Sequence, residues 1–151
     1  MANNEANTKI KVLIVDESEI VRIYLRDIFW INGFENYCEL MSATNLNDAE
    51  AIVADPKTRP DVIFLALSLR KKVDGHTHID PKNSFAFVRS IKSDPALQHI
   101  KVFIISSLLK EQFEKDIAES KVDKYISKDQ NLPKDMIPII KSFTGAMQPT
   151  A

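Results

Sequence analysis

The stretch Pro60-Asp-Val-Ile-Phe-Leu-Ala-Leu-Ser-Leu69 decides the fold of this 151-residue chain. After its opening Pro-Asp, it is a nearly unbroken apolar run of strand length, which is typical of a strand buried on both faces of a parallel sheet. Ala66 lies where this strand should end, and open parallel sheets place their chemistry at the carboxyl ends of their strands. A small apolar residue at this point indicates a site that has lost its central group.

Length and composition favour a single globular domain. Hydrophobic residues make up 44% of the chain and charged residues 27%, as in ordinary soluble proteins. The formal charge of -1 favours neither nucleic acid nor a membrane surface as a partner. Cys38 is the only cysteine, which excludes an internal disulfide. With no signal peptide and no run long enough to span a bilayer, we expect a cytoplasmic protein.

Strand and helix patterns alternate along the chain on both sides of the central strand. The expected strands cover residues 10–15, 37–43, 60–66, 102–105 and 122–126. The expected helices cover 18–32, 110–120 and 133–143, a helix that begins at 45 or 47 and ends at 54, and a helix that begins at 83 or 84 and ends at 94. An irregular region from 70 to 82 contains the turn signals Asp74-Gly75 and Asp80-Pro81. The alternation predicts a doubly wound α/β domain over residues 10–143, with tails at 1–9 and 144–151.

Two expected helices carry unusual features. In helix 18–32, an inward stripe is expected from Ile20, Ile23, Tyr24, Asp27, Ile28 and Ile31, and Phe29 and Trp30 are expected in core or rim packing. In the last helix, Pro138 removes a hydrogen bond. That helix should therefore either kink or begin near Ile137.

The polar residues that follow the strands form a coherent set. Asp16, Glu17, Ala66, Ser106 and Lys128 should gather at one edge of the sheet. Adjacent carboxylates can hold a divalent cation such as Mg²⁺, a hydroxyl can bond a phosphoryl oxygen, and a lysine can neutralise developing charge. A nucleophile between them is missing.

Residues 10–143 resemble a response-regulator receiver domain, the phosphoacceptor module of two-component signalling. The resemblance rests on Val-Leu-Ile-Val-Asp-Glu-Ser at 12–18, Pro-Asp-Val-Ile-Phe-Leu-Ala at 60–66, Val-Phe-Ile-Ile-Ser-Ser at 102–107 and Asp-Lys-Tyr-Ile-Ser-Lys at 123–128. It implies a flavodoxin-like fold with a five-stranded parallel sheet in the order 2-1-3-4-5 and helices on both faces.

The resemblance also implies a role for each matching residue. Asp16 and Glu17 match the family's magnesium-binding acidic pair, Ser106 its phosphate-sensing hydroxyl residue, Tyr125 its switch aromatic and Lys128 its phosphate-contacting lysine. Ala66 falls on the aspartate that takes the phosphate, and a methyl group can neither be phosphorylated nor ligate a metal.

Further departures from the family also indicate that the usual receiver chemistry is absent. Asp129 follows Lys128 where a cis-bonded proline is usual, Arg70 replaces a proline, and Ser84 replaces the glycine that opens the third helix. The loop before that helix is longer by about eight residues. An engineered Asp-to-Ala change would explain Ala66 alone, so natural divergence is the preferred interpretation.

Simpler structural interpretations exist for these residues. Without a carboxylate at position 66, a magnesium site at Asp16 and Glu17 is weakened, and the two acids are expected to pair with Lys128. Ser106 is expected to bond backbone and Tyr125 to pack as a half-buried strand aromatic. His76, His78 and Asp80 could face one side as metal ligands, but solvated loop residues are preferred, as they are for the basic run 70–72.

The sequence therefore predicts a stand-alone pseudo-receiver that works without phosphorylation or a cofactor and is not an enzyme. It should be a monomer or weak dimer that binds a protein partner, such as a sensor kinase or another signalling protein, through residues 108–143. One alternative is a conventional phosphoacceptor that uses another residue, such as Asp74, or that has an engineered Ala66. The other is a flavodoxin-like protein that binds a metal or small molecule through residues 76–80.

Overall fold

The computed structural model describes residues 9–128 and 132–145 of the chain. The tail expected at 1–9 lies outside the described residues except for Lys9, and the tail expected from 144 lies outside them from residue 146. Thr144 was assigned to that tail, but it is a buried residue of the last helix. The helix therefore ends one residue later than its apolar pattern indicates.

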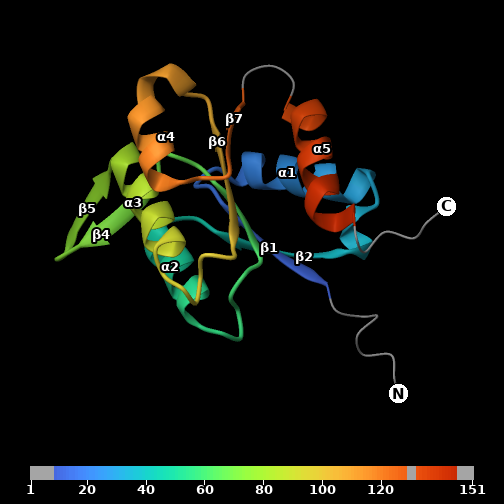
Figure 1. The fold of residues 1–151 in the computed structure, drawn as a ribbon, viewed down its shortest axis with the longest axis horizontal. Coiled ribbons are helices and arrows are strands. Elements are labelled where there is room, and N and C mark those ends of the chain that lie inside the picture. The colour runs from blue at the N-terminus through green and yellow to red at the C-terminus, as the bar shows by residue number, and fades with distance from the viewer. Residues whose placement is uncertain (1–8, 129–131, 146–151) are drawn as a thin grey trace.

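A five-stranded parallel sheet forms the centre of the molecule, in the order β2-β1-β3-β6-β7 (Figure 1). Its strands are β1 (Ile10–Val15), β2 (Cys38–Ala43), β3 (Val62–Leu65), β6 (Lys101–Ser106) and β7 (Lys124–Ser127). Because β4 and β5 form a separate sheet, this order confirms the expected 2-1-3-4-5 arrangement. β3 is buried at every position and pairs with β1 on one side and β6 on the other.

Helices cover both faces of the sheet (Figure 1). α1 (Glu19–Ile31) and α5 (Leu132–Thr144) pack on one face, and α2 (Leu46–Ala54), α3 (Pro81–Lys92) and α4 (Glu114–Ser120) pack on the other. Short 3-10 turns occur at η2 (Phe34–Asn36) and η3 (Lys110–Phe113), so the helix expected over 110–120 is divided in two. No helix within the described ranges has the length and apolar character needed to cross a membrane.

Alternating side chains along the strands belong to two hydrophobic cores, one on each face of the sheet. In β3, Ile63 and Leu65 join the core under α2, α3 and α4, whereas Val62 and Phe64 join the core under α1 and α5. This alternation follows from the two-residue period of a strand. The central apolar run is thus buried on both faces, as its composition predicts.

The loop expected to be irregular over 70–82 is instead a β-hairpin. β4 (Arg70–Val73) and β5 (His76–Ile79) pair antiparallel, and Asp74 and Gly75 form the turn between them. Both turn residues have positive φ, 53° and 80°, which a two-residue hairpin turn of type I′ requires. The turn signal was correct, but the charged, exposed strands lack the alternating apolar pattern that identifies a strand.

The start of α3 also differs from the expectation. The helix begins at Pro81 rather than at 83 or 84, because the Asp80 side chain accepts a hydrogen bond from the Lys82 amide (2.9 Å) as the N-cap. Proline is favourable in the first turn of a helix, where no amide hydrogen is needed. Asp80-Pro81 is therefore a helix start and not only a turn.

The inward stripe expected for α1 is wrong. Leu25, Ile28 and Phe29 are buried, whereas Trp30 and most of the expected stripe are exposed. α1 has apolar side chains on nearly all sides, so periodicity alone could not decide which side faces the sheet. Its N-cap is Ser18, the first residue of the expected helix, whose hydroxyl oxygen accepts a hydrogen bond from the Val21 amide.

The last helix continues through Pro138. α5 spans Leu132–Thr144, so a start near Ile137 is wrong. Met136 before the proline and Ile140 after it are both fully buried in the same core. Packing on both sides of Pro138 outweighs the hydrogen bond that the ring removes.

Candidate functional site

Four of the five predicted edge residues surround one small cavity at the carboxyl edge of the sheet. Asp16 follows β1, Ala66 follows β3, Ser106 ends β6 and Lys128 follows β7. They line a cavity of about 90 Å³ that is completed by Leu67, Ser68, Ile105 and Ser107. Glu17, the fifth predicted residue, is not part of the lining.

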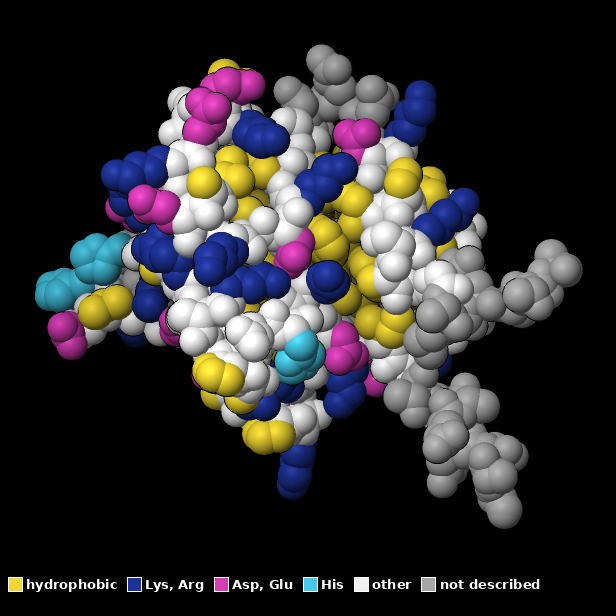
Figure 2. Space-filling view, in the orientation of Figure 1, with side chains coloured by type: hydrophobic (Ala, Val, Ile, Leu, Met, Phe, Trp, Pro, Cys, Tyr) yellow, Lys and Arg dark blue, Asp and Glu magenta, His cyan; other side chains and the backbone are white. Residues whose placement is uncertain are grey.

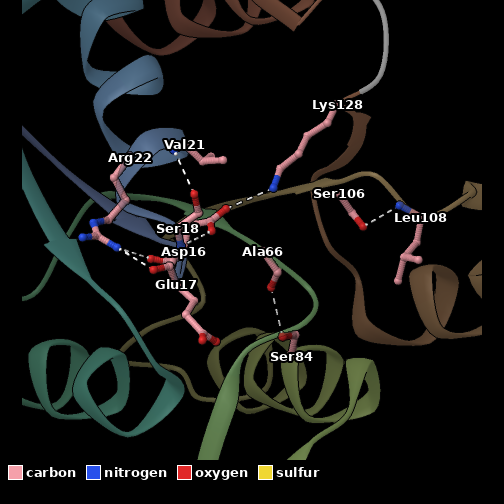
Figure 3. Close-up of polar contacts among 10 residues, drawn as sticks. All are labelled: Asp16, Glu17, Ser18, Val21, Arg22, Ala66, Ser84, Ser106, Leu108 and Lys128. Atoms are coloured by element: carbon pink, nitrogen blue, oxygen red, sulfur yellow. Dashed lines mark hydrogen bonds and ion pairs between the residues drawn. The ribbon is translucent and has the colours of Figure 1, made fainter.

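Both carboxylate oxygens of Asp16 have partners (Figure 3). Oδ2 accepts a hydrogen bond from Lys128 Nζ at 3.1 Å, and Oδ1 accepts one from the Ser18 amide at 2.9 Å. The Asp16 and Lys128 side chains are only 10% and 25% exposed, so water screens this pair less than a surface pair. The predicted ion pair between Asp16 and Lys128 is therefore present.

Glu17 pairs with a residue of the hairpin instead of Lys128. Its Oε1 lies 3.1 Å from Arg70 Nη2, and both side chains are well exposed. Figure 3 shows the Glu17 side chain pointing away from the Asp16–Lys128 pair. The expectation that Glu17 pairs with Lys128 is therefore wrong, because successive side chains leave the backbone in different directions.

A second arginine holds the backbone of the acidic pair. Arg22 Nη1 donates hydrogen bonds to the carbonyl oxygens of Asp16 at 2.7 Å and Glu17 at 3.1 Å. Arg22 lies on α1, one turn after the N-cap Ser18. The guanidinium thus fixes the turn between β1 and α1 from which both carboxylates extend (Figure 3).

Ala66 is buried at the centre of the edge, and its backbone is fully bonded. Its amide donates to the Val15 carbonyl at 3.0 Å. The Ser84 hydroxyl lies within hydrogen-bond distance of the Ala66 and Leu67 carbonyls, at 3.0 and 3.1 Å. Ser84 is completely buried one turn into α3, so it fixes the end of β3 rather than starting the helix.

Ser106 and Tyr125 are both tied to the segment after β6. The Leu108 amide donates to Ser106 Oγ at 3.0 Å, and the Tyr125 hydroxyl donates to the Leu108 carbonyl at 2.7 Å. Burial raises the pKa of Tyr125, which outweighs the lowering effect of a hydrogen bond with Ser106. The predicted hydroxyl-to-backbone contact of Ser106 is present, and Tyr125 is buried rather than half-buried.

The donor set does not fit a divalent cation. Asp16 is the only acid in the described lining of the cavity, and both Asp16 and its neighbour Glu17 already pair with an internal cation. No three His, Cys, Asp or Glu side chains come together as metal ligands within residues 9–128 and 132–145. Mg²⁺ usually needs near-octahedral oxygen coordination, which two occupied carboxylates do not provide.

The other predicted candidates lie away from this cavity. His76 and His78 are exposed on β5, and Figure 2 shows histidine side chains at the edge of the molecule where Figure 1 places the hairpin. Asp74 lies in the hairpin turn and lines a different cavity. Asp129 lies outside the described residues.

Three residues of this edge were not recognised by sequence reasoning in the roles they have. Arg22 has no distinguishing motif, and Ser84 was noted only as a departure from the receiver pattern. Arg70 was noted as such a departure and as part of the basic run 70–72, which was expected to be a solvated turn but is a strand whose Arg70 and Lys71 pair with Glu17 and Glu50. The long loop before α3 was the available signal for Arg70, because the hairpin that it forms brings Arg70 to Glu17. Asn47 on α2 completes this arrangement by bonding both the amide and the carbonyl of Lys72.

The chain is similar to known response regulators in sequence and in fold. No protein-family model matches it. It is 27% identical over 134 residues to the polar-differentiation response regulator DivK of Brucella anthropi, covering 89% of this chain and 95% of that protein.

Solved structures of receivers superpose on most of the chain. The phosphorylated cyanobacterial phytochrome response regulator RcpA has a TM-score of 0.67 at 22% identity, covering 95% of this chain and 97% of that chain. The receiver domain of a signal transduction histidine kinase from Syntrophus aciditrophicus has a TM-score of 0.69 at 21% identity, covering 93% and 94%. The chemotaxis response regulator CheY4 of Vibrio cholerae has a TM-score of 0.66 at 18% identity, covering 89% and 98%. The shared fold and the similarity to DivK together support a response-regulator receiver domain of two-component signalling.

Proposed function

We propose that this chain is a pseudo-receiver, which acts in two-component signalling without being phosphorylated at the usual position and without enzymatic activity. The observation that carries the proposal is Ala66, a buried residue whose methyl group is part of the lining of the edge cavity. Aspartyl phosphorylation requires a carboxylate oxygen as nucleophile. Alanine has none.

The side chains around Ala66 support the same conclusion. Lys128, which would neutralise a phosphoryl group, is bonded to Asp16, and Arg70 is bonded to Glu17. The internal cations balance the acidic pair, so the edge of the sheet needs neither Mg²⁺ nor phosphate to compensate its charge. The cavity is held in one arrangement by contacts within the chain.

In this proposal, the domain passes on its signal through contacts with another protein. We assign those contacts to residues 108–143, the region of α4, β7 and α5. Tyr125 is buried and tied to the Leu108 carbonyl, and the neighbouring Leu109 side chain is 58% exposed. Because Tyr125 is held in one position, the surface around it should keep one conformation. Such a surface suits constitutive binding to a signalling partner.

Amide NMR spectra of the labelled protein test the proposal. Acetyl phosphate with Mg²⁺ should leave the amides of Asp16, Ala66 and Lys128 unchanged in the natural chain. In Ala66→Asp, the same addition should shift them, and Ala66→Asn serves as a control of similar shape without a carboxylate. Equal shifts in the natural chain and in Ala66→Asp would overturn the proposal.

A further inference from the structure

The outward side of α1 is unusually apolar. Of the eight exposed large hydrophobic side chains in the described part of the chain, five lie on this helix. Their exposed fractions are 79% for Ile20, 48% for Ile23, 42% for Tyr24, 67% for Trp30 and 75% for Ile31. A helix that is apolar both toward its own core and toward water is typical of a helix covered on both sides.

These residues repeat at the spacing of a helix-packing seam. Ile20, Ile23 and Tyr24 are each followed seven positions later by Asp27, Trp30 and Ile31. A seven-residue repeat places all six side chains along one side of a helix that packs against another helix. We call these six residues the α1 outer face.

A cavity beside this face favours a cationic side chain. It measures about 410 Å³ and is lined by Ile23, Arg26, Asp27, Trp30, Glu35 and Leu40. Glu35 Oε1 is buried and accepts no hydrogen bond from the described residues. Asp27 likewise has no ion pair with them. A desolvated carboxylate oxygen beside an unpaired carboxylate attracts a positive charge.

We propose that a second copy of this chain covers the α1 outer face, with the two α1 helices antiparallel about a two-fold axis near Leu25 and Arg26. In this arrangement, Ile20 faces Ile31 of the second copy, and Tyr24 faces its Asp27. Arg26 of each copy reaches Asp27 of the other, so two ion pairs form by symmetry. A parallel pair would place Asp27 against Asp27, which is unfavourable.

The α1 outer face lies on the opposite side of the sheet from α4, and the proposed interface depends neither on Ala66 nor on phosphorylation. Sedimentation equilibrium of the full chain tests it directly, because a dimer should form as concentration rises. The only tryptophan, Trp30, lies on this face and reports the same event. Its emission should shift to shorter wavelength, and acrylamide should quench it less, over the same concentration range.

A charge exchange tests which residues meet. Arg26→Asp alone and Asp27→Arg alone should each raise the dimer dissociation constant about tenfold or more, since like charges then face each other. An equimolar mixture of these two variants should form a heterodimer, because each acid again faces a base. Ile79→Glu, which changes an exposed side chain of the β4–β5 hairpin, should leave dimerisation unchanged.

Circular dichroism confirms that each variant is folded, which is expected because Arg26 and Asp27 are exposed. A monomer at about 0.5 mM would overturn the proposal, since specific dimers form well below that concentration. A dimer that neither single substitution weakens would also overturn it, as would a mixture that forms no heterodimer.

Discussion

One methyl group changes what the side chains around it do. Asp16 and Lys128 occupy the positions of a metal ligand and a phosphate contact in the receiver pattern, yet here they bond to each other at 3.1 Å. Ala66 lies between the strand ends and offers no competing charge (Figure 3). We therefore expect the ion pair between Asp16 and Lys128 to stabilise the folded chain.

Lys128→Met should lower the free energy of unfolding by about 1–2 kcal/mol, because it leaves the Asp16 carboxylate partly buried with no cation. This loss in the free energy of unfolding is smaller than for a fully buried ion pair, since the Lys128 side chain is 25% exposed and water screens its charge in part. Urea denaturation at pH 7 measures the change.

Lys82→Met is the matched control, because Lys82 pairs with Asp116 but is 74% exposed. Lys82→Met should lower the free energy of unfolding by less than about 0.5 kcal/mol. Equal losses for the two variants would contradict a specific role for the Asp16–Lys128 pair.

Cys38 should make stability fall at high pH. Burial raises the pKa of its thiol to about 11, so the folded protein keeps a proton that the unfolded chain loses near pH 9. The stabilisation is therefore present below pH 9 and is lost as the pH rises toward 11, by up to about 3 kcal/mol.

Unfolding free energies between pH 8 and 10.5 test this dependence, with Cys38→Ala as the comparison. The natural chain should lose more stability over this range than Cys38→Ala does. If the free energy of unfolding fell equally with pH in both proteins, the Cys38 thiol would not be the cause of the loss of stability.

The β4–β5 hairpin illustrates how one element can be anchored by few contacts. Asn47 Oδ1 accepts from the Lys72 amide at 2.7 Å, and Asn47 Nδ2 donates to the Lys72 carbonyl at 3.1 Å. These are the bonds that a neighbouring strand would make with β4. Lys71 adds an ion pair to Glu50 of α2 at 3.1 Å.

Asn47→Ala should loosen the hairpin while the rest of the fold persists. Hydrogen exchange at the Lys72 amide should become at least about tenfold faster, because a net hydrogen bond is worth about 1 kcal/mol and two are lost. Asn83→Ala removes an amide side chain that makes no hydrogen bond with the described residues and should leave this rate unchanged. Unchanged exchange in Asn47→Ala would mean that other contacts hold the hairpin.

Prediction from sequence was good for elements with a clear apolar pattern and poor for those without one. The long apolar runs of β1, β3 and β6 identify the parallel sheet, and the caps Ser18 and Asn45 mark two helix starts. β4 and β5 are short and charged, so their pairing depends on the turn and on Asn47 rather than on a pattern of their own. The orientation of α1 was missed because both of its sides are apolar.

At the scale of the whole molecule, one sheet carries two separate cores. Phe64 packs against Phe29 and Phe103 under α1 and α5, whereas Phe85 of α3 lies in the core on the other face, beside Phe113. Both rings are almost completely buried. Since the same strands supply both cores, neither should unfold alone.

Phe64→Ala and Phe85→Ala should each lower the free energy of unfolding by about 3–5 kcal/mol. Trp30 fluorescence and far-ultraviolet circular dichroism should give the same transition midpoint in each variant, as expected for cooperative unfolding. Separate midpoints for the two probes would show that the two cores unfold independently.

The positions of the edge residues could be predicted because parallel strands end together. The ion pair between Asp16 and Lys128 could also be predicted, although the two residues are 112 positions apart, because both follow strands of the sheet. The partner of Glu17 could not be predicted, because Arg70 reaches Glu17 only when the hairpin has formed. Such pairings depend on side-chain direction in three dimensions, which spacing along the chain does not determine. The loss of the acceptor at Ala66 needed no structure, because it is a property of one residue.

Intact mass after incubation with acetyl phosphate and Mg²⁺ tests the central claim most directly. The natural chain and Ala66→Asn should show no added phosphoryl group, whereas Ala66→Asp should gain one, since a carboxylate then lies between Asp16 and Lys128. A phosphoryl group on the natural chain would contradict the claim that this receiver works without phosphorylation.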